Sequence, residues 1–263
     1  MLGRKLVAHL EPADFLAVVQ PAERMGHNET AHKLMRLRGQ VTRYARITGR
    51  VKYDVAAGLT EALRPVQNTH FAAVTEPEAI GQLLRDIDDY TGHTSVLFCL
   101  KILPYVFTRP SELRLAQWSE FDLEGAVWRI PAKRMKMRRE HVVPLAHQVL
   151  AMLHELHRYT GNCEFLFPSI RALTTPISDM APLAALRRMG YAKDAMTLHG
   201  FRAMASTRLN ELGFRADVIE AQLAHKEPDA VRLAYNRAEY MDERRTLMQS
   251  WADYLDGLRN ETA

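Results

Sequence analysis

Residues 94–113, TSVLFCLKILPYVFTRPSEL, contain the most apolar stretch of the chain and the turn that follows it. The apolar run covers residues 95–107, includes Lys101 and Pro104, and is too short to span a bilayer. Its length and composition predict a helix that begins near Thr94. The stretch therefore indicates a globular protein rather than a membrane protein.

Arg109 lies between this apolar helix and the next predicted helix, which opens with Pro110. Proline is favoured just inside a helix start because its missing N–H has no intrahelical partner there. An arginine before that proline would lie near a helix N-terminus, where anions bind favourably. For this residue alone, a surface ion pair with Glu112 is the simpler interpretation.

The composition sets broad limits on function. Of 263 residues, 47% are hydrophobic and 25% are charged, as in ordinary globular proteins. Lys and Arg number 35 and Asp and Glu number 31, and the net charge of +4 permits a nucleic-acid partner without requiring one. Two cysteines, Cys99 and Cys163, predict neither a disulfide framework nor a zinc motif. We find no signal peptide, and we expect a cytoplasmic protein.

Residues 65–75, PVQNTHFAAVT, separate two parts of the chain. They show neither helical nor strand periodicity, and they open with a proline. We therefore expect a linker here, with one domain over residues 1–70 and a second over residues 71–263.

The second part predicts helices around one β-hairpin. Residues 126–130 and 141–145 are the strand candidates, and the basic segment KRMKMRR, residues 133–139, connects them. Thr75 and Glu78 would form a capping box at the first helix. The expected helices after the linker cover residues 76–90, the run from Thr94, and residues 147–159, 178–189, 199–212, 216–223, 228–236 and 238–258. The fold class is mainly α with a small β-hairpin.

Residues 29–48 predict a helix in the first domain. Four apolar residues at helical spacing are expected to face the core: Leu34, Leu37, Val41 and Tyr44. Five basic residues recur beside them: Lys33, Arg36, Arg43, Arg46 and Arg50. A solvated charged face is the usual explanation, but no acidic residue lies between Ala31 and Tyr53, and a face of one sign attracts a polyanion. DNA contact is the interpretation we favour.

Other candidate residues lie nearer the C-terminus. His199 and Arg202 are three residues apart and share one helix face, where an imidazole and a guanidinium suit a phosphate. His225 and Tyr235 follow, and Tyr240 is a second tyrosine nearby. Taken singly, each has a plainer explanation: a capping or solvated histidine, a solvated arginine, or a half-buried tyrosine.

The candidate residues follow one another in a recognisable order along the chain: an arginine, a lysine-bearing hairpin, His-x-x-Arg, a histidine and then a tyrosine. This order resembles that of the tyrosine recombinases, also called phage-type integrases. The similarity is closest over residues 108–240, and its motifs are similar to the prophage integrase branch in particular. Four strings carry it: TRPSELRLAQWSEFDL, RMKMRREHVVPL, LHGFRAMASTRLNELGF and QLAHKEPDAVRLAYNRAEYMDERR. The resemblance implies the tyrosine recombinase catalytic fold, preceded by a partial helical core-binding domain.

The resemblance also implies a set of catalytic residues: Arg109, Lys136, His199, Arg202, His225 and Tyr235. The two arginines would stabilise a DNA phosphodiester in its transition state, and the lysine would protonate the leaving 5′-oxygen. Lys133 is the fallback for Lys136. The two histidines would bond the phosphate or transfer a proton, with their roles undivided, and Glu112 would support the first arginine.

Tyr235 matches the nucleophile of the family, and we prefer it to Tyr240. A tyrosine hydroxyl with a pKa of about 10 needs a base to attack, and a covalent intermediate divides one difficult step into two. The resemblance implies a 3′-phosphotyrosine intermediate and a free 5′-hydroxyl. No metal or nucleotide cofactor is expected.

The implied partner is double-stranded DNA at attachment sites. The protein is expected to be a tetramer on DNA and a monomer when free, and to associate with the nucleoid. The expected DNA contacts are Lys33, Arg36, Arg43, Arg46, Arg50, Arg134, Arg138 and Arg139. In the last helix, Met241, Leu247, Trp251 and Leu255 are expected to pack on their own domain rather than on a neighbour.

Compared with the family, the chain is expected to be N-terminally shortened. By the resemblance, the arm-binding domain and an earlier start of the core-binding helices are the parts expected to be missing. A site-specific recombinase is the leading hypothesis. The alternatives are an integrase remnant that binds DNA without completing recombination, a topoisomerase with the same chemistry and, remotely, a structural protein.

Overall fold

The computed structural model describes residues 5–66, 72–224 and 240–261. The chain divides into two compact units, Met1–His70 and Phe71–Ala263. In the part of the chain that is described, no helix is both long and apolar enough to cross a membrane.

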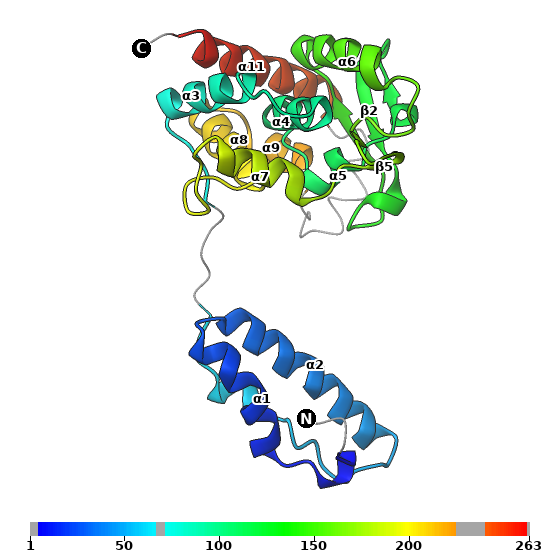
Figure 1. Ribbon diagram of the computed structural model, residues 1–263, viewed down its shortest axis with the longest axis vertical. Helices are drawn as coiled ribbons and strands as arrows, with labels where there is room; N and C mark the ends of the chain where they lie inside the picture. Colours follow the sequence, from blue (N-terminus) through cyan, green and yellow to red (C-terminus); the bar gives the residue numbers. More distant parts are fainter. Residues whose placement is uncertain (1–4, 67–71, 225–239, 262–263) are drawn as a thin grey trace. The chain divides into compact units, whose positions relative to one another are not determined.

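The first unit is a helical hairpin with short flanking 3-10 turns. Helices α1 (Pro12–Arg24) and α2 (Asn28–Ile47) pack against each other, and the turns η2 (Val7–His9) and η3 (Leu59–Ala62) flank them (Figure 1). Its small core consists of Phe15, Val19, Ala22, Ala31, Met35 and Leu63.

The buried face of α2 differs from the prediction. Small or unbranched residues face the core, namely Ala31, Met35, Gly39, Thr42 and Ala45. The expected core residues Leu37, Val41 and Tyr44 are instead 53%, 62% and 60% exposed, and Leu34 is only partly buried. The assignment was wrong for Leu37, Val41 and Tyr44, whereas Leu34 packs against the core. Small side chains let α2 approach its neighbours closely, which a pattern of large apolar residues does not reveal. All five basic residues expected to contact DNA on this helix and just after it are exposed.

In the second unit, helix α4 (Thr94–Val106) occupies the centre. It is apolar on nearly all sides, as expected for a buried helix, and it packs against α3 (Pro77–Asp88), α6 (His147–Thr160), α7 (Met180–Arg188) and α8 (Gly200–Glu211). Figure 1 shows it among these helices and α11 (Met241–Asn260). The shorter helices are α5 (Pro110–Arg114) and α9 (Ala216–Gln222).

A three-stranded antiparallel sheet covers one side of this helical core. Its order is β1 (Phe121–Asp122), β2 (Val127–Ile130) and β3 (His141–Pro144), with Val127 opposite Pro144 and Ile130 opposite His141. The expected β-hairpin with a basic connection is therefore present, and the connection includes η5 (Ala132–Arg134). The 3-10 turn η4 (Trp118–Glu120) and a small hairpin of β4 (Pro168–Ser169) and β5 (Ala172–Pro176) were not expected.

Most predicted helices agree with the structure to within a few residues, but the capping box at Thr75 is wrong. Helix α3 begins at Pro77, and Glu76 is its N-cap in extended conformation. Proline at the first helical position fixes that start, because the residue before a proline is driven out of the helical region. The helix predicted over residues 228–236 and the first residues of the one predicted over 238–258 lie outside the described residues.

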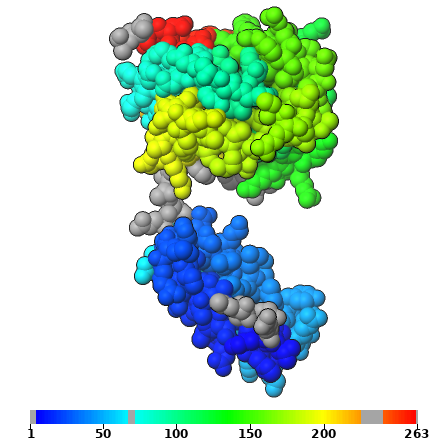
Figure 2. All heavy atoms as spheres, in the orientation of Figure 1, coloured from blue at the N-terminus to red at the C-terminus, as the bar shows by residue number. Residues whose placement is uncertain are grey.

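Helix α11 packs on its own domain, as expected. Leu247, Trp251 and Leu255 are buried in the main core, whereas Met241 is only partly buried. Its C-terminal end is held by α3, where the Arg85 guanidinium donates to the carbonyls of Leu258, Arg259 and Glu261 at 2.9–3.2 Å. In the space-filling view, α11 (red) adjoins the atoms of α3 and α4 (cyan to teal) (Figure 2).

This close packing predicts opposite effects for two glycine-to-alanine changes. A Cβ at Gly81 on α3 would lie 2.3 Å from the carbonyl oxygen of Leu258, whereas a Cβ at Gly257 on α11 would meet nothing within 4 Å. Gly81→Ala should lower the free energy of unfolding by about 1–3 kcal/mol through overpacking. Gly257→Ala, the matched control, should raise it by about 0.5–1 kcal/mol through backbone entropy. Urea unfolding measures both, and a neutral Gly81→Ala would contradict the close approach.

Candidate active site

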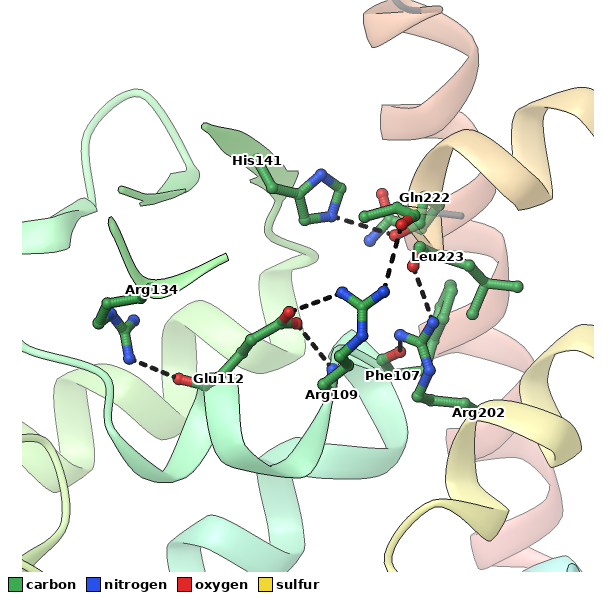
Figure 3. A network of polar contacts seen from close by, with 9 residues as sticks. Phe107, Arg109, Glu112, Arg134, His141, Arg202, Gln222 and Leu223 are labelled. Carbon is green, nitrogen blue, oxygen red and sulfur yellow. Dashed lines mark hydrogen bonds and ion pairs between the residues drawn. The ribbon is translucent and has the colours of Figure 1, made fainter. Parts of the chain in front are cut away.

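The first predicted arginine lies at the junction of α4 and α5. Phe107 ends α4 in the left-handed region at φ 34°, and Arg109 is the N-cap residue of α5. Glu112, which is only 4% exposed, accepts from the Arg109 main-chain N–H at 2.9 Å and from its Nη1 at 2.8 Å (Figure 3). The Arg109–Glu112 pair is therefore present, but Glu112 is buried, so it is not the surface pair that was the simpler interpretation. The pair fixes the arginine at the start of the helix.

The second predicted arginine, Arg202, comes from α8 and lies beside the first. Its Nη1 donates to the Phe107 carbonyl at 2.9 Å and its Nη2 to the Leu223 carbonyl at 2.7 Å. The Arg109 Nη2 donates to the next carbonyl, that of Ala224, at 3.4 Å. Burial, and then the nearby charge of Arg109, lower the pKa of Arg202 to about 10. The two arginines thus share the end of α9 as an anchor, as Figure 3 shows.

His199 is the residue just before α8 and is exposed. Although the residue is exposed overall, desolvation of its imidazole by the surrounding protein lowers its pKa, and the charges of Arg202 and Arg109 add to that effect. An imidazole with a lowered pKa is neutral at pH 7 and can either donate or accept a hydrogen bond. The structure therefore brings together Arg109, from the start of α5, with His199 and Arg202, from the start of α8.

Lys136 lies in the connection between β2 and β3 and is exposed, as are Lys133, Arg138 and Arg139. Met135, in contrast, is buried. The connection is thus anchored at its base while its basic side chains face outward.

Arg134 is part of that anchor. Its side chain is 13% exposed, its Nη2 pairs with Glu120 Oε2 at 2.5 Å, and its Nη1 donates to the Glu112 carbonyl at 3.0 Å. Trp128 Nε1 donates to the same Glu120 oxygen at 3.0 Å. These contacts favour a supporting role for Arg134 inside the domain over the DNA contact expected from the sequence, because a charge run does not reveal which of its members turns inward.

Three polar residues that the sequence reasoning missed lie next to the arginines. His141 is buried on β3, and its Nε2 donates to the Gln222 carbonyl at 3.1 Å. Gln222 and Arg244 are fully buried and bond to each other. Only Arg244 gave a signal, since it interrupts the apolar stripe of the last helix. Burial, followed by the charge of Arg244, lowers the pKa of His141 to about 3.

Two predicted catalytic residues, His225 and Tyr235, lie outside the described residues, in the gap between Ala224 and Tyr240. Tyr240, the alternative nucleophile, is the N-cap residue of α11 at φ 49°, and the Arg215 guanidinium lies 5.2 Å from its ring centre. Across the described ranges, no cluster of three or more His, Cys, Asp or Glu side chains has the arrangement of a metal site.

The lowered pKa of His141 predicts an acid-sensitive fold. Below pH 6.5 the unfolded chain protonates this histidine and the folded chain does not, until about pH 3. Over that window the free energy of unfolding should fall by up to about 1.4 kcal/mol for each pH unit of acidification, because of His141. Urea unfolding between pH 7 and 5 measures the slope. His141→Gln should flatten it, and the exposed His154→Gln should not; equal slopes would contradict the assignment.

The inward position of Arg134 predicts that its substitution affects stability first. Arg134→Met leaves the buried Glu120 carboxylate without its cation and should cost about 3–5 kcal/mol. The exposed Arg139→Met, its control on the same connection, should leave stability unchanged. Thermal unfolding measures both variants. An Arg134→Met variant that unfolds like the parent would contradict the inward ion pair.

Comparison with known proteins agrees with the resemblance found in the sequence. The chain is 36% identical over 278 residues to the integrase of Enterobacteria phage P4, covering 99% of this chain and 62% of that protein. It is also 36% identical over 256 residues to the prophage integrase IntA of Escherichia coli K12, covering 97% of this chain and 61% of that protein. The chain thus spans less than two thirds of the length of these two relatives.

Solved structures are similar in fold at low sequence identity. A lambda integrase dimer bound to a COC′ core site has a TM-score of 0.66 at 16% identity, covering 84% of this chain and 81% of that chain. The Tn1549 transposon integrase in complex with circular intermediate DNA has a TM-score of 0.66 at 15% identity, covering 94% and 88%. These likenesses establish the mainly α fold with its small sheets.

Family models cover both units of the chain. The phage integrase central domain matches residues 1–62, and the phage integrase family matches residues 74–241. The second match spans more than half of the sequence and includes every residue of the site described above except Arg244. This chain belongs to the phage integrase family.

Proposed function

We propose that the protein is a site-specific DNA recombinase that cleaves and rejoins DNA through a 3′-phosphotyrosine. The observation that carries this proposal is that Arg109 and Arg202 lie side by side. They come from separate elements and are oriented by the adjacent carbonyls of Ala224 and Leu223 at the end of α9. We assign residues 1–70 to a partial core-binding domain and residues 71–263 to the catalytic domain.

The charge of the site favours a phosphate. Two guanidinium groups and the buried Glu112 carboxylate leave an excess of positive charge, and the pKa of Arg202 falls because burial and Arg109 disfavour its charged form. A phosphodiester would supply the missing negative charge. Each such preoriented contact to a developing oxyanion is commonly worth about 3–4 kcal/mol in the transition state.

The remaining steps follow from the predicted roles. Tyr235 would lose its hydroxyl proton to a base and attack phosphorus, so that a bond from phosphorus to the tyrosine oxygen forms and the bond to the 5′-oxygen breaks. Lys136 would protonate that leaving oxygen. His199 and His225 would bond the phosphate or carry the proton. A 5′-hydroxyl from another strand then reverses these steps, so the energy of the phosphodiester is retained.

Duplex DNA at attachment sites is the proposed partner. The basic residues of α2 and the exposed Arg138 and Arg139 would contact backbone phosphates, and affinity should therefore fall steeply with salt. We propose a monomer in the absence of DNA and a tetramer on paired sites, because recombination exchanges four strands. A lambda integrase tetramer bound to a Holliday junction is among the structures of similar fold. Such a protein would act in the cytoplasm, on the nucleoid.

Covalent trapping tests this proposal. The protein is incubated with a nicked duplex carrying a candidate attachment site, then denatured and examined for a protein–DNA adduct. We expect an adduct in the parent and in Tyr240→Phe, and none in Tyr235→Phe.

Each other outcome has a distinct meaning. Loss of the adduct only in Tyr240→Phe would move the nucleophile to that residue. Retained DNA binding with no adduct from any form would favour the alternative, an integrase-derived protein that occupies DNA without cleaving it.

A further inference from the structure

Arg244 is a fully buried arginine of α11 that bonds across to two other elements. Its Nε and Nη2 both donate to Gln222 Oε1, at 3.0 and 2.7 Å, and its Nη2 also donates to the Val142 carbonyl at 2.5 Å. Burying a guanidinium is costly, and an apolar residue on this stripe would pack at lower cost. The contacts of Arg244 therefore serve something other than core packing.

Gln222 is held from two sides. It is the last residue of α9, its side-chain oxygen accepts from Arg244, and its main-chain carbonyl accepts from the buried His141. The pKa of His141 stays low, so the ring remains neutral, and its Nε2–H is the donor to that carbonyl. The end of α9 is thus fixed to both β3 and α11.

The two residues after Gln222 hold the arginines. The Leu223 carbonyl accepts from Arg202, and the Ala224 carbonyl accepts from Arg109. Ala224 adopts φ 49°, a left-handed conformation that costs about 1–2 kcal/mol for a residue with a Cβ. A strained turn of this kind persists only where its surroundings determine it, and Gln222 is the nearest preceding residue whose side chain is hydrogen-bonded to another element.

We propose that Arg244 and Gln222 form a positioning pair, which fixes the end of α9 and thereby orients Arg109 and Arg202 for the scissile phosphate. This inference rests on the proposed recombinase function. Neither residue of the pair touches DNA: the pair acts through the carbonyls of Leu223 and Ala224. The C-terminal helix α11 is by this route a structural part of the active site.

Strand cleavage measures the effect. Gln222→Met and Arg244→Met keep the side-chain size and remove the bond between the pair. Displacing both arginines should lower the rate of adduct formation at saturating DNA about 100-fold. DNA affinity should stay unchanged, because the pair lies below the surface. The matched control is Arg245→Met, one residue along the same helix and exposed, which should cleave like the parent.

A double-mutant cycle separates positioning from general damage. If the pair acts through Arg202, Arg244→Met should slow cleavage far less in an Arg202→Lys background than in the parent. Additive losses in the cycle, a fall in DNA affinity parallel to the fall in rate, or an unchanged rate in both Met variants would overturn the proposal.

A second measurement does not depend on cleavage. In protein labelled with ¹⁵N-arginine, the Nε–H signals of Arg109 and Arg202 are assigned by substituting each with lysine. Gln222→Met should shift both signals, Arg244→Lys should shift them less, and Arg245→Met should leave them unchanged. Unmoved signals in Gln222→Met would overturn the proposal.

The cleavage assay and the arginine signals distinguish failure of the proposed recombinase function from failure of the positioning pair. A parent protein that forms no adduct refutes the proposed function, and the arginine signals still decide whether the pair positions the guanidinium groups. If Arg244→Met does not fold, Gln222→Met and Arg244→Lys carry the same comparison. In Gln222→Met the buried guanidinium still has the Val142 carbonyl as an acceptor, and in Arg244→Lys the buried cation still has Gln222 Oε1 nearby.

Discussion

The buried carboxylate of Glu112 is the contact on which the site depends. It accepts from both the main chain and the guanidinium of Arg109, and the main-chain carbonyl of the same residue accepts from Arg134. A buried carboxylate costs several kcal/mol unless it is paired and hydrogen-bonded. Both conditions are met here, and the result is that one residue ties Arg109 to the base of the connection that carries Lys136.

The protonation states of the ionisable side chains in the site depend on burial and on neighbouring charges as well as on residue type. Burial and neighbouring arginines lower the pKa values of Arg202, His199 and His141, so the histidines stay neutral while the guanidinium groups carry the positive charge. The excess of positive charge left by this balance favours an anion at the site. The same balance also keeps a neutral imidazole next to the arginines, where it can exchange a proton.

The local part of this structure could be predicted from the sequence, and the long-range part could not. The apolar run of α4, the proline after Arg109 and the strands on each side of the basic connection follow from local rules. The buried face of α2 does not, because the spacing of large apolar residues points to the wrong side of the helix. The inward turn of Arg134 and the bond between Gln222 and Arg244 join distant residues, and neither leaves a pattern along the chain.

The same long-range contacts tie the site to complete folding. Arg202 is oriented by carbonyls at Phe107 and Leu223, and the end of α9 is held by groups from β3 and α11. These elements come from positions up to about half of the chain apart, and contacts of this separation form only after the loops between them have closed. A partly folded chain therefore has the residues of the site without their arrangement. It follows that α11, although distant in sequence from Arg109, has to dock before the end of α9 is held from both sides and the two guanidinium groups reach the arrangement described above.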